Sequence, residues 1–431
     1  MLAVRVTVGI LAIAVLSLLL IIRMRVSMVS WSSILAATAQ GASIPKHQTS
    51  NLEGPLRFNA DGSFHISVLQ DLHFGENAWE YWGPLQDKAT LGVINSVLDN
   101  GKPDLVVLNG DLTTGENLFV ENSTNYIDMM VAPMVKRGLP WASTYGNHDY
   151  QVNITGELIL EREQQYPNAR TRQMVSGKGI GVSNYYLPVY PADCVGCDCA
   201  PELMLWFFDS RGGFRYQELN DRGREVPFPN WVDEAVVTWF KESSARIQAR
   251  FGKVIPSLGF VHIPTNASQA LQLAGVDPNR QPGVDNDRPL SQQAQGWCAD
   301  GRNGCAYGGQ DVPFMEAVVS TPGMMALFSG HDHGNTWCHR WEGKLPGISV
   351  AGGGIDLCFG QHTGYGGYSS WIRGARQISV TQEKLAKFEV DTWNLLEDGR
   401  SVGAVTLNAT YGQDWYPAVP NDRTSCNCES D

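Results

Sequence analysis

The stretch "DLVVLNGD" (residues 104–111) places four consecutive aliphatic residues shortly before a glycine and an aspartate. A short apolar run bounded by turn residues is typical of a strand buried on both faces. Similar runs recur along the chain, and most end in glycine or in a residue that can bind metal: "FHISVLQD" (64–71), "LPWASTYGNHD" (139–149), "LMLWFFDS" (203–210), "PSLGFVHIP" (256–264) and "MMALFSGHDH" (324–333). The sequence therefore predicts buried strands with polar residues at their carboxyl ends.

Helical patterns separate these runs. The segment 85–98 has apolar residues at three- and four-residue spacing and is followed by Gly101 and Pro103, which end helices. Two further helices are predicted over 126–136 and 231–251. Strands that alternate with helices indicate an α/β protein whose sheet is covered on both faces. In such sheets, ligands bind outside the carboxyl ends of the strands.

The composition narrows the class of protein. The chain has 431 residues, of which 43% are hydrophobic and 18% charged, so it can bury a large core and differs from disordered proteins. Its net charge of -12 and its pI near 5.2 argue against a surface that coats nucleic acid, because Lys and Arg bind phosphate backbones. An anionic substrate would need positive charge supplied locally, for example by metal ions.

The N-terminus predicts a targeting segment. Residues 6–22 form a run of 17 uncharged, mainly apolar residues flanked by arginines. This run is longer than the ~7–15 residues of a signal-peptide core and just reaches the ~17–25 of a membrane span. We therefore expect residues 1–39 to be a cleaved signal peptide or an uncleaved signal anchor, and residues 40–62 to be a polar linker.

Glycosylation motifs and cysteines favour the secretory pathway. The chain has nine cysteines, several of them grouped as in "CVGCDC" (194–199), and four N-x-S/T sequons, at Asn122, Asn153, Asn266 and Asn408. With the leader, they favour a secreted glycoprotein with disulfides, or an anchored one with its main domain in the lumen. A zinc knuckle is the alternative for 194–199, but no second Cys/His cluster follows at finger spacing.

A long polar segment interrupts the alternation of strands and helices. Residues 265–311 are rich in Asn, Asp, Gln, Gly and Pro, and Cys298 and Cys305 are spaced so that they could form a disulfide within them. Loops of this length inside compact domains are usually functional covers or disordered. We expect an insertion loop that contributes to the choice of substrate, and a Cys-containing tail over 413–431.

Residues that can bind metal close five of the apolar runs. In chain order they are Asp71 and His73, Asp111, Asn147, His262, and His331 with His333. Each of these residues or short motifs alone is common in proteins. Together they meet the needs of a two-metal hydrolytic site, in which ions ~3.5–4 Å apart clamp a phosphoryl group and generate a hydroxide. Asp111 suits the bridging position because Gly110 lets the chain turn sharply there.

The spacing and charge of these residues favour the same site. In an extended chain, residues i and i+2 share a side, so Asp71 and His73 can meet at one ion. The same argument brings His331 and His333 to the site and turns the intervening Asp332 away. Asn147 and His262 would fill the remaining positions as neutral ligands. With only two carboxylates, two ions would keep a net positive charge that attracts a phosphate dianion.

Three further residues are candidates for handling the substrate. His148 follows a ligand directly and so faces the region that a substrate would occupy, where it can protonate the leaving alkoxide. Asp149 is placed to orient or charge His148, and a supporting hydrogen-bond role is the alternative to direct action. Arg211 could bind substrate phosphate, but a surface or ion-paired arginine is an equal alternative. Four other histidines are expected to be structural: His47, His65, His339 and His362.

The chain resembles the calcineurin-like metallophosphoesterase superfamily through five motifs in this order: D-x-H (71–73), G-D (110–111), G-N-H-D (146–149), a lone His (262) and G-H-D-H (330–333). Its segments "GFVHIP", "SGHDHGN" and "HTGYGGYSSWIRGAR" are similar to purple-acid-phosphatase-like proteins of fungi and plants. The resemblance covers roughly residues 62–410. It implies an α/β fold with two mixed β-sheets sandwiched between helices (α/β/β/α) in a catalytic domain over 63–412.

The resemblance also implies how the ligands are shared. One ion would be held by Asp71, His73, Asp111 and His333, and the other by Asp111, Asn147, His262 and His331. Purple acid phosphatases carry an iron-bound tyrosine in the segment that corresponds to 71–74, where this chain has His73, so the purple absorption should be absent. The two ions are expected to be Fe, Zn or Mn. Some relatives are described as inactive, but every ligand position is filled here, which favours activity.

These observations predict a binuclear-metal-dependent phosphoesterase, with metal-bound hydroxide as nucleophile and His148 as general acid. A phosphomonoesterase, either acid-phosphatase-like or a protein phosphatase, is expected to act on a small molecule or a phosphoprotein. Two alternatives stay open: a phosphodiesterase of nucleotides or lipid head groups, and a non-catalytic regulatory protein that keeps the metal site. The substrate, the metals and the disulfide pairing do not follow from the sequence.

Overall fold

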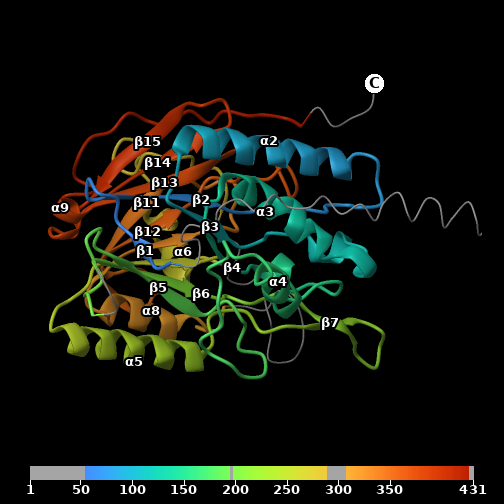
Figure 1. Cartoon of the computed structure of the whole chain (residues 1–431), viewed down its shortest axis with the longest axis horizontal. Helices are drawn as coiled ribbons and strands as arrows, with labels where there is room; N and C mark the ends of the chain where they lie inside the picture. Colours follow the sequence, from blue (N-terminus) through green and yellow to red (C-terminus); the bar gives the residue numbers. More distant parts are fainter. Residues whose placement is uncertain (1–53, 195–197, 289–306, 427–431) are drawn as a thin grey trace, which may run out of the picture. The chain divides into compact units, whose positions relative to one another are not determined.

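The computed structural model describes residues 54–194, 198–288 and 307–426. In these residues, two mixed β-sheets pack face to face, and helices cover their outer faces (Figure 1). The α/β/β/α arrangement predicted from the sequence is therefore confirmed. The predicted leader over 1–39 and the pair Cys298 and Cys305 lie outside the described residues.

The first sheet has six strands in the order β15-β14-β13-β2-β3-β4. In that order the strands are Ser401–Leu407, Val390–Leu396, Gly374–Thr381, Ser63–Leu69, Leu105–Asn109 and Trp141–Thr144. β2, β3 and β4 run parallel to one another, and β13 pairs antiparallel with β2. The outer face is covered by α2 (Gly83–Gly101) and α3 (Asn125–Arg137), with α4 (Gly156–Glu163) beside α3.

The second sheet has seven strands in the order β1-β5-β6-β9-β10-β12-β11. In that order the strands are Leu56–Arg57, Tyr185–Tyr190, Leu203–Phe208, Ser257–Val261, Met324–Ser329, Ala351–Phe359 and Cys338–Lys344. Its outer face packs against α5 (Glu234–Phe251) and α8 (Val312–Ser320). The remaining elements are the hairpin β7–β8 (Phe214–Leu219 and Glu225–Pro227), α6 (Asn266–Ala274) and α9 (Gln382–Leu385).

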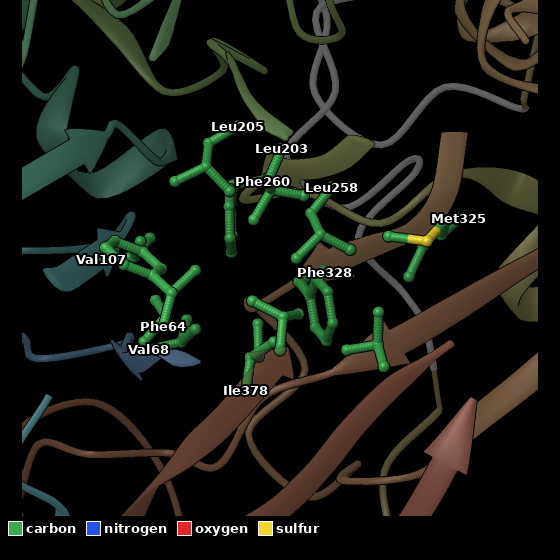
Figure 2. Packing of buried hydrophobic residues seen from close by; sticks show 14 of the residues in the cluster. Phe64, Val68, Val107, Leu203, Leu205, Leu258, Phe260, Met325, Phe328 and Ile378 are labelled. Carbon is green, nitrogen blue, oxygen red and sulfur yellow. The ribbon is translucent and has the colours of Figure 1, made fainter. Parts of the chain in front are cut away.

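Buried strands explain the apolar runs in the sequence. In β3, Leu105 and Val107 face the second sheet, while Val106 and Leu108 face α2 and α3. Figure 2 shows the layer between the sheets, where Val107 lies in one cluster with residues such as Phe260. Because both faces of the central strands are covered, they show no apolar/polar alternation. The layers hold the strand ends in place, since truncating a buried aromatic such as Phe260 to Ala typically costs about 3–5 kcal/mol.

Two disulfides lie in the described residues. Cys338 and Cys358 join the neighbouring strands β11 and β12, and Cys194 pairs with Cys199 inside "CVGCDC". The prediction of disulfides is therefore confirmed, and the second bridge argues against a zinc knuckle in that motif. Within residues 54–194, 198–288 and 307–426, no helix has both the length and the apolar character that crossing a membrane requires. The predicted segment 6–22 lies outside these residues.

Candidate metal centre

The predicted ligands converge at one edge of the two sheets. Each follows the carboxyl end of a strand: Asp71 and His73 follow β2, Asp111 follows β3, Asn147 follows β4, His262 follows β9, and His331 and His333 follow β10. All seven side chains are buried, although their strands belong to different sheets. The carboxyl ends of parallel strands meet at one edge, which explains why residues so distant in sequence come together.

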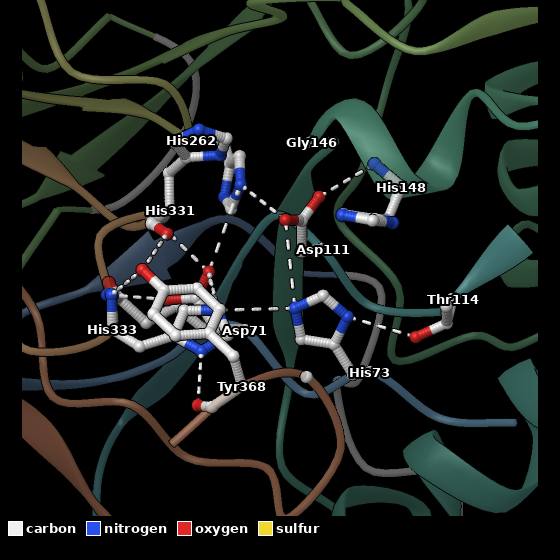
Figure 3. Close-up of polar contacts among 12 residues, drawn as sticks. Asp71, His73, Asp111, Thr114, Gly146, His148, His262, His331, His333 and Tyr368 are labelled. Carbon is white, nitrogen blue, oxygen red and sulfur yellow. Dashed lines mark hydrogen bonds and ion pairs between the residues drawn. The ribbon is translucent and has the colours of Figure 1, made fainter. Parts of the chain in front are cut away.

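The ligand atoms form two groups, Asp71 with His73 and His333, and Asp111 with His262 and His331. In each group the atoms lie within 4.8 Å of one another. Asp111 also links the groups, because its Oδ2 lies 2.9 Å from Nε2 of His262 and 3.8 Å from Nε2 of His73 (Figure 3). This placement is what a carboxylate that bridges two ions requires. Asn147 is fully buried in the one-turn helix Asn147–Asp149.

The backbone of the ligand loops differs from the extended chain assumed above. Asp71 and His73 have φ of 52° and 49°, Asp111 has 48° and His331 has 74°, so all four are in the left-handed region. Non-glycine residues in this conformation cost of order 1–3 kcal/mol each and cluster at functional sites. The side chains do converge, but through tight turns and not through two-residue alternation. Asp332 belongs to neither ligand group, although it is among the residues that line the cavity described below.

Glycines allow the ligand loops to approach one another. A Cβ on Gly146 would lie 2.3 Å from Oδ1 of Asp111, and one on Gly110 would lie 2.4 Å from the His262 ring. Gly110 also has φ of 85°, which favours glycine. The "G-D" and "G-N-H-D" motifs thus place glycine where a side chain would displace a ligand.

Contacts on the far side of three rings orient the imidazoles. Nδ1 of His73 lies 3.0 Å from the Thr114 hydroxyl, Nδ1 of His262 lies 2.8 Å from the Asn109 carbonyl, and Nδ1 of His333 lies 3.2 Å from a backbone carbonyl. Each contact leaves Nε2 to face the centre, which is the arrangement usual around metal-binding histidines.

An unpartnered nitrogen supports the fit to metal. Nδ1 of His331 is buried and has no hydrogen-bond partner among the described residues. A buried polar atom left in this way is costly unless an ion or water binds it. Imidazole, carboxylate and amide donors in these numbers suit two ions such as Zn, Mn or Fe.

The pKa values of the ligands depend mainly on burial and on one another. Burial lowers the pKa of His73 to about 4 and that of His331 to about 3, so both rings are neutral donors at neutral pH. Burial raises the pKa of Asp71 to about 7. Burial opposes charge on His262 too, but Asp111 outweighs it and raises the pKa of His262 to about 9. Protons therefore balance the buried carboxylates, and binding of metal would release them.

His148 is held by a carboxylate that the sequence analysis missed. Its Nδ1 lies 2.9 Å from Oε1 of Glu116, and its backbone N–H donates to Oδ1 of Asp111 at 2.8 Å. Burial lowers the pKa of His148, but the carboxylates of Glu116 and Asp111 outweigh this and raise it to about 10. Glu116 follows the "G-D" motif by five residues, so "GDLTTGE" contains an acidic residue that could have been proposed.

Asp149 contacts the backbone of the Asp111 loop. Its carboxylate accepts hydrogen bonds from the N–H groups of Leu112 at 3.0 Å, Thr113 at 3.0 Å and Gly146 at 2.9 Å. It therefore joins the loop after β3 to the loop after β4. This matches the supporting role named as the alternative for Asp149, while the carboxylate beside the His148 ring is Glu116.

A cavity of about 450 Å³ opens over the ligands. The described residues that line it include His148 and Glu116 on one side and Tyr368 with Asp287 and Arg288 of the insertion loop on the other. They do not include Arg211, whose guanidinium donates to the carbonyls of Trp231 and Gly179 and to the carboxylate of Asp233. The structure thus places Arg211 in an ion-paired, supporting position.

The segment "HTGYGGYSSWIRGAR" packs against the ligands. The ring of Tyr368 stacks on that of His333, with 4.0 Å between the ring centroids. The ring of His362 is also buried, and its centroid lies 3.9 Å from that of His333. Gly367 has φ of 73°, and a Cβ there would lie 2.5 Å from the His333 ring. Neither Tyr368 nor Gly367 was among the residues predicted for the site.

Comparisons with known proteins agree with this geometry. The family model described as calcineurin-like phosphoesterase matches residues 64–335. The chain is 25% identical to "Probable inactive purple acid phosphatase 14" of Arabidopsis thaliana over 376 residues, which cover 80% of this chain and 83% of the relative. It is 26% identical to "Phosphatase DCR2" of Saccharomyces cerevisiae over 352 residues, which cover 79% of this chain and 55% of the relative.

Two solved structures are also similar. One is a dimetal phosphatase from Danio rerio, with a TM-score of 0.45 and 14% identity over 80% of this chain and 98% of that one. The other is purple acid phosphatase PPD1 from yellow lupin, with a TM-score of 0.41 and 10% identity over 86% of this chain and 57% of that one. Because the family model matches more than half of the chain and spans every predicted ligand, the chain belongs to the calcineurin-like phosphoesterase family.

Proposed function

We propose that the chain is a metal-dependent hydrolase of phosphate esters and that it acts as a phosphomonoesterase. The observation that carries the proposal is the pair of three-residue ligand groups, which Asp111 links. Asp71, His73, Asp111 and His333 would hold one ion, and Asp111, Asn147, His262 and His331 the other. Two such ions, when bound, polarise a phosphoryl group and supply a nucleophile from water at neutral pH.

The chain's own residues have defined tasks in this reaction. His148 lines the cavity and is kept protonated by Glu116 and Asp111, so it can donate a proton to the leaving-group oxygen. Asp149 holds the loop that carries Asp111 through hydrogen bonds to its backbone. Glycines beside the ligands allow the loops that would hold the two ions to lie close together.

Charge favours a monoester over a diester. The proposed ligand set contains only two carboxylates, so two divalent ions would leave a positive centre, and a monoester dianion gains more from it than a diester anion. Outside the ligand set and His148, the described charged residues that line the cavity are Arg288, Glu76, Glu116, Asp287 and Asp332, so the positive charge for a dianion would come mainly from the ions. The alternative of a phosphodiesterase predicts the opposite substrate preference.

Metal analysis together with an assay tests the proposal. The chain loaded with Mn, Zn or Fe should hold about two ions and should hydrolyse an aryl monophosphate faster than a bis-aryl phosphate. Asp111→Asn should lower both metal content and rate, while Asp221→Asn, in the exposed β7–β8 turn, should change neither. Equal rates for Asp111→Asn and the parent would contradict an enzymatic role, and a faster diester reaction would favour the phosphodiesterase. Two bound ions without hydrolysis of either ester would favour a non-catalytic role.

We further propose that the domain works in the secretory pathway, either secreted or anchored through residues 6–22. The two disulfides support this location because such bonds form in oxidising compartments. Of the predicted sequons, Asn122 lies exposed on the surface, where a glycan would be accommodated. Digestion of the cell-derived protein with an endoglycosidase should lower its mass, and an unchanged mass would count against the proposal.

A further inference from the structure

Two loops that form one wall of the cavity are joined to each other. The loop 74–82 contributes Glu76 to the lining, and the loop 112–122 contributes Thr114 and Glu116. The Thr114 hydroxyl donates to Glu76 at 2.7 Å. The N–H of Ala78 donates to the second loop at the carbonyl of Asn117, at 3.2 Å. These hydrogen bonds join the two loops into one wall of the cavity.

Each loop carries an exposed aromatic side chain three residues beyond its glutamate. Trp79 follows Glu76 and is 52% exposed, and Phe119 follows Glu116 and is 45% exposed. The two rings contact each other edge to face, with centroids 6.1 Å apart. Three residues span at most about 11 Å of chain, so each aromatic residue follows closely on a glutamate that lines the cavity, although neither ring is itself among the lining residues. Exposed aromatic surface of this kind commonly marks a binding site.

The position of His148 gives the direction in which a substrate extends. The leaving-group oxygen has to reach the His148 ring in order to receive its proton. Glu116 holds that ring at 2.9 Å, and it belongs to the same loop as Phe119. A leaving group that extends from His148 along this wall would run past Glu116 towards Phe119 and Trp79.

We propose that Trp79 and Phe119 form an aromatic subsite that binds a planar aromatic group in the leaving group of the phosphoester. This inference rests on the proposed function, because it takes the bond broken to be the one next to His148. Aromatic rings favour stacking or edge-to-face contact with other planar groups. Glu76 and Glu116 disfavour a second anionic group on this wall, so a neutral or cationic aromatic leaving group is expected, as in an aryl or nucleoside monophosphate.

Binding of non-hydrolysable analogues tests the subsite without catalysis. The metal-loaded full chain should bind phenylphosphonate about fivefold more tightly than methylphosphonate, measured by titration calorimetry. In Trp79→Ala with Phe119→Ala, that ratio should fall to about one while the Kd of methylphosphonate is unchanged. Trp79→Tyr, which keeps a ring, should retain most of the preference. Trp415→Ala is the matched control, because Trp415 is 73% exposed and lies in the C-terminal segment.

Kinetics with three monoesters separates the sources of the aromatic group. An aryl monophosphate and a nucleoside 5′-monophosphate are compared with glycerol phosphate. In the double variant KM should rise about fivefold for at least one aromatic ester, with kcat nearly unchanged and KM for glycerol phosphate unaffected. Which aromatic ester responds identifies the source.

Two results would overturn the subsite. One is a parent protein without any phenylphosphonate preference, and the other is a double variant that weakens both phosphonates equally, which would mean general damage to the loops. Failure of the proposed function has a different outcome: no ester is hydrolysed, although the phenylphosphonate preference and its loss in the double variant are still observed.

Discussion

Nδ1 of His148 lies 2.9 Å from Oε1 of Glu116, while the backbone N–H of the same histidine donates to Asp111, the carboxylate between the two ligand groups. His148, the proposed proton donor, thus contacts the metal centre through its main chain and a separate carboxylate through its ring. Catalytic groups that transfer protons are commonly oriented by a neighbouring group in this way.

Glu116→Gln should slow the reaction of esters with poor leaving groups. The amide keeps the size of the side chain but no longer holds a charged imidazolium, so kcat for an alkyl phosphate should fall about ten- to a hundredfold. For 4-nitrophenyl phosphate the loss should be much smaller, because nitrophenolate leaves without a proton. His148→Ala should show the same contrast. Equal losses for both esters would exclude His148 as the general acid.

Asp149→Asn should affect the stability of the fold more than the chemical step. Asp149 accepts hydrogen bonds from three backbone N–H groups through both of its carboxyl oxygens, whereas an amide would turn an NH2 group towards some of these donors. Replacing the carboxylate should lower the free energy of unfolding by about 1–3 kcal/mol, measured by urea denaturation. Asp221→Asn, in the exposed β7–β8 turn, serves as the comparison and should leave stability nearly unchanged. A stable Asp149→Asn protein would remove the structural role described here.

His331→Ala and His333→Ala should each remove one ion. The two histidines lie in different ligand groups, although one residue separates them in sequence. Elemental analysis should therefore give about one ion per chain in each single variant and fewer in the double variant. His339→Ala, on β11 and outside both groups, should keep about two. If either single variant lost both ions or neither, the assignment of the two histidines to separate ions would be wrong.

Gly146→Ala and Gly92→Ala should have opposite effects. A Cβ at Gly146 would lie 2.3 Å from Oδ1 of Asp111, so the new methyl group should displace the carboxylate and lower metal content and kcat at least tenfold. A Cβ at Gly92, exposed on α2, meets nothing within 4 Å. There, alanine should stabilise the helix by about 0.5–1 kcal/mol without changing activity. Full metal content in Gly146→Ala would show that the loop can shift to accommodate the methyl group.

Asp356→Asn should stabilise the protein increasingly as the pH rises. Burial raises the pKa of Asp356 to about 7, above its value in the unfolded chain, and Arg340 at 3.6 Å offsets this only partly. The stability that the protonated form contributes is complete below about pH 4 and is lost as the pH rises through 7. The Asn side chain cannot ionise. The free energy of unfolding of Asp356→Asn should therefore rise relative to that of the parent by on the order of 3–4 kcal/mol between pH 4 and 8.

Denaturant unfolding of both proteins at several pH values measures this difference. The exposed Asp221→Asn should show no such trend. A pH-independent difference between Asp356→Asn and the parent would mean that the Asp356 carboxyl does not titrate in this range.

The sequence by itself determined the layers and the ligand positions. Runs such as 105–108 are typical of strands buried on both faces, and 85–98 has the periodicity of a covering helix. The ligands follow those runs directly, as Asp111 does in "DLVVLNGD", so their positions at strand ends depend on local sequence alone. The resemblance to the calcineurin-like phosphoesterases also rests on short motifs such as "GNHD" and "GHDH".

The tertiary structure decided which side chains meet around those ligands. Glu116 reaches His148 across 32 residues, Tyr368 stacks on His333 across 35, and the left-handed turns at Asp71 and His331 aim the donors inward. Such contacts depend on the packing of loops from two sheets, which leaves no periodic pattern in the chain. Local sequence therefore specified the donors, and the packing of the loops specified their partners, because side-chain contacts across sheets are set by the whole fold.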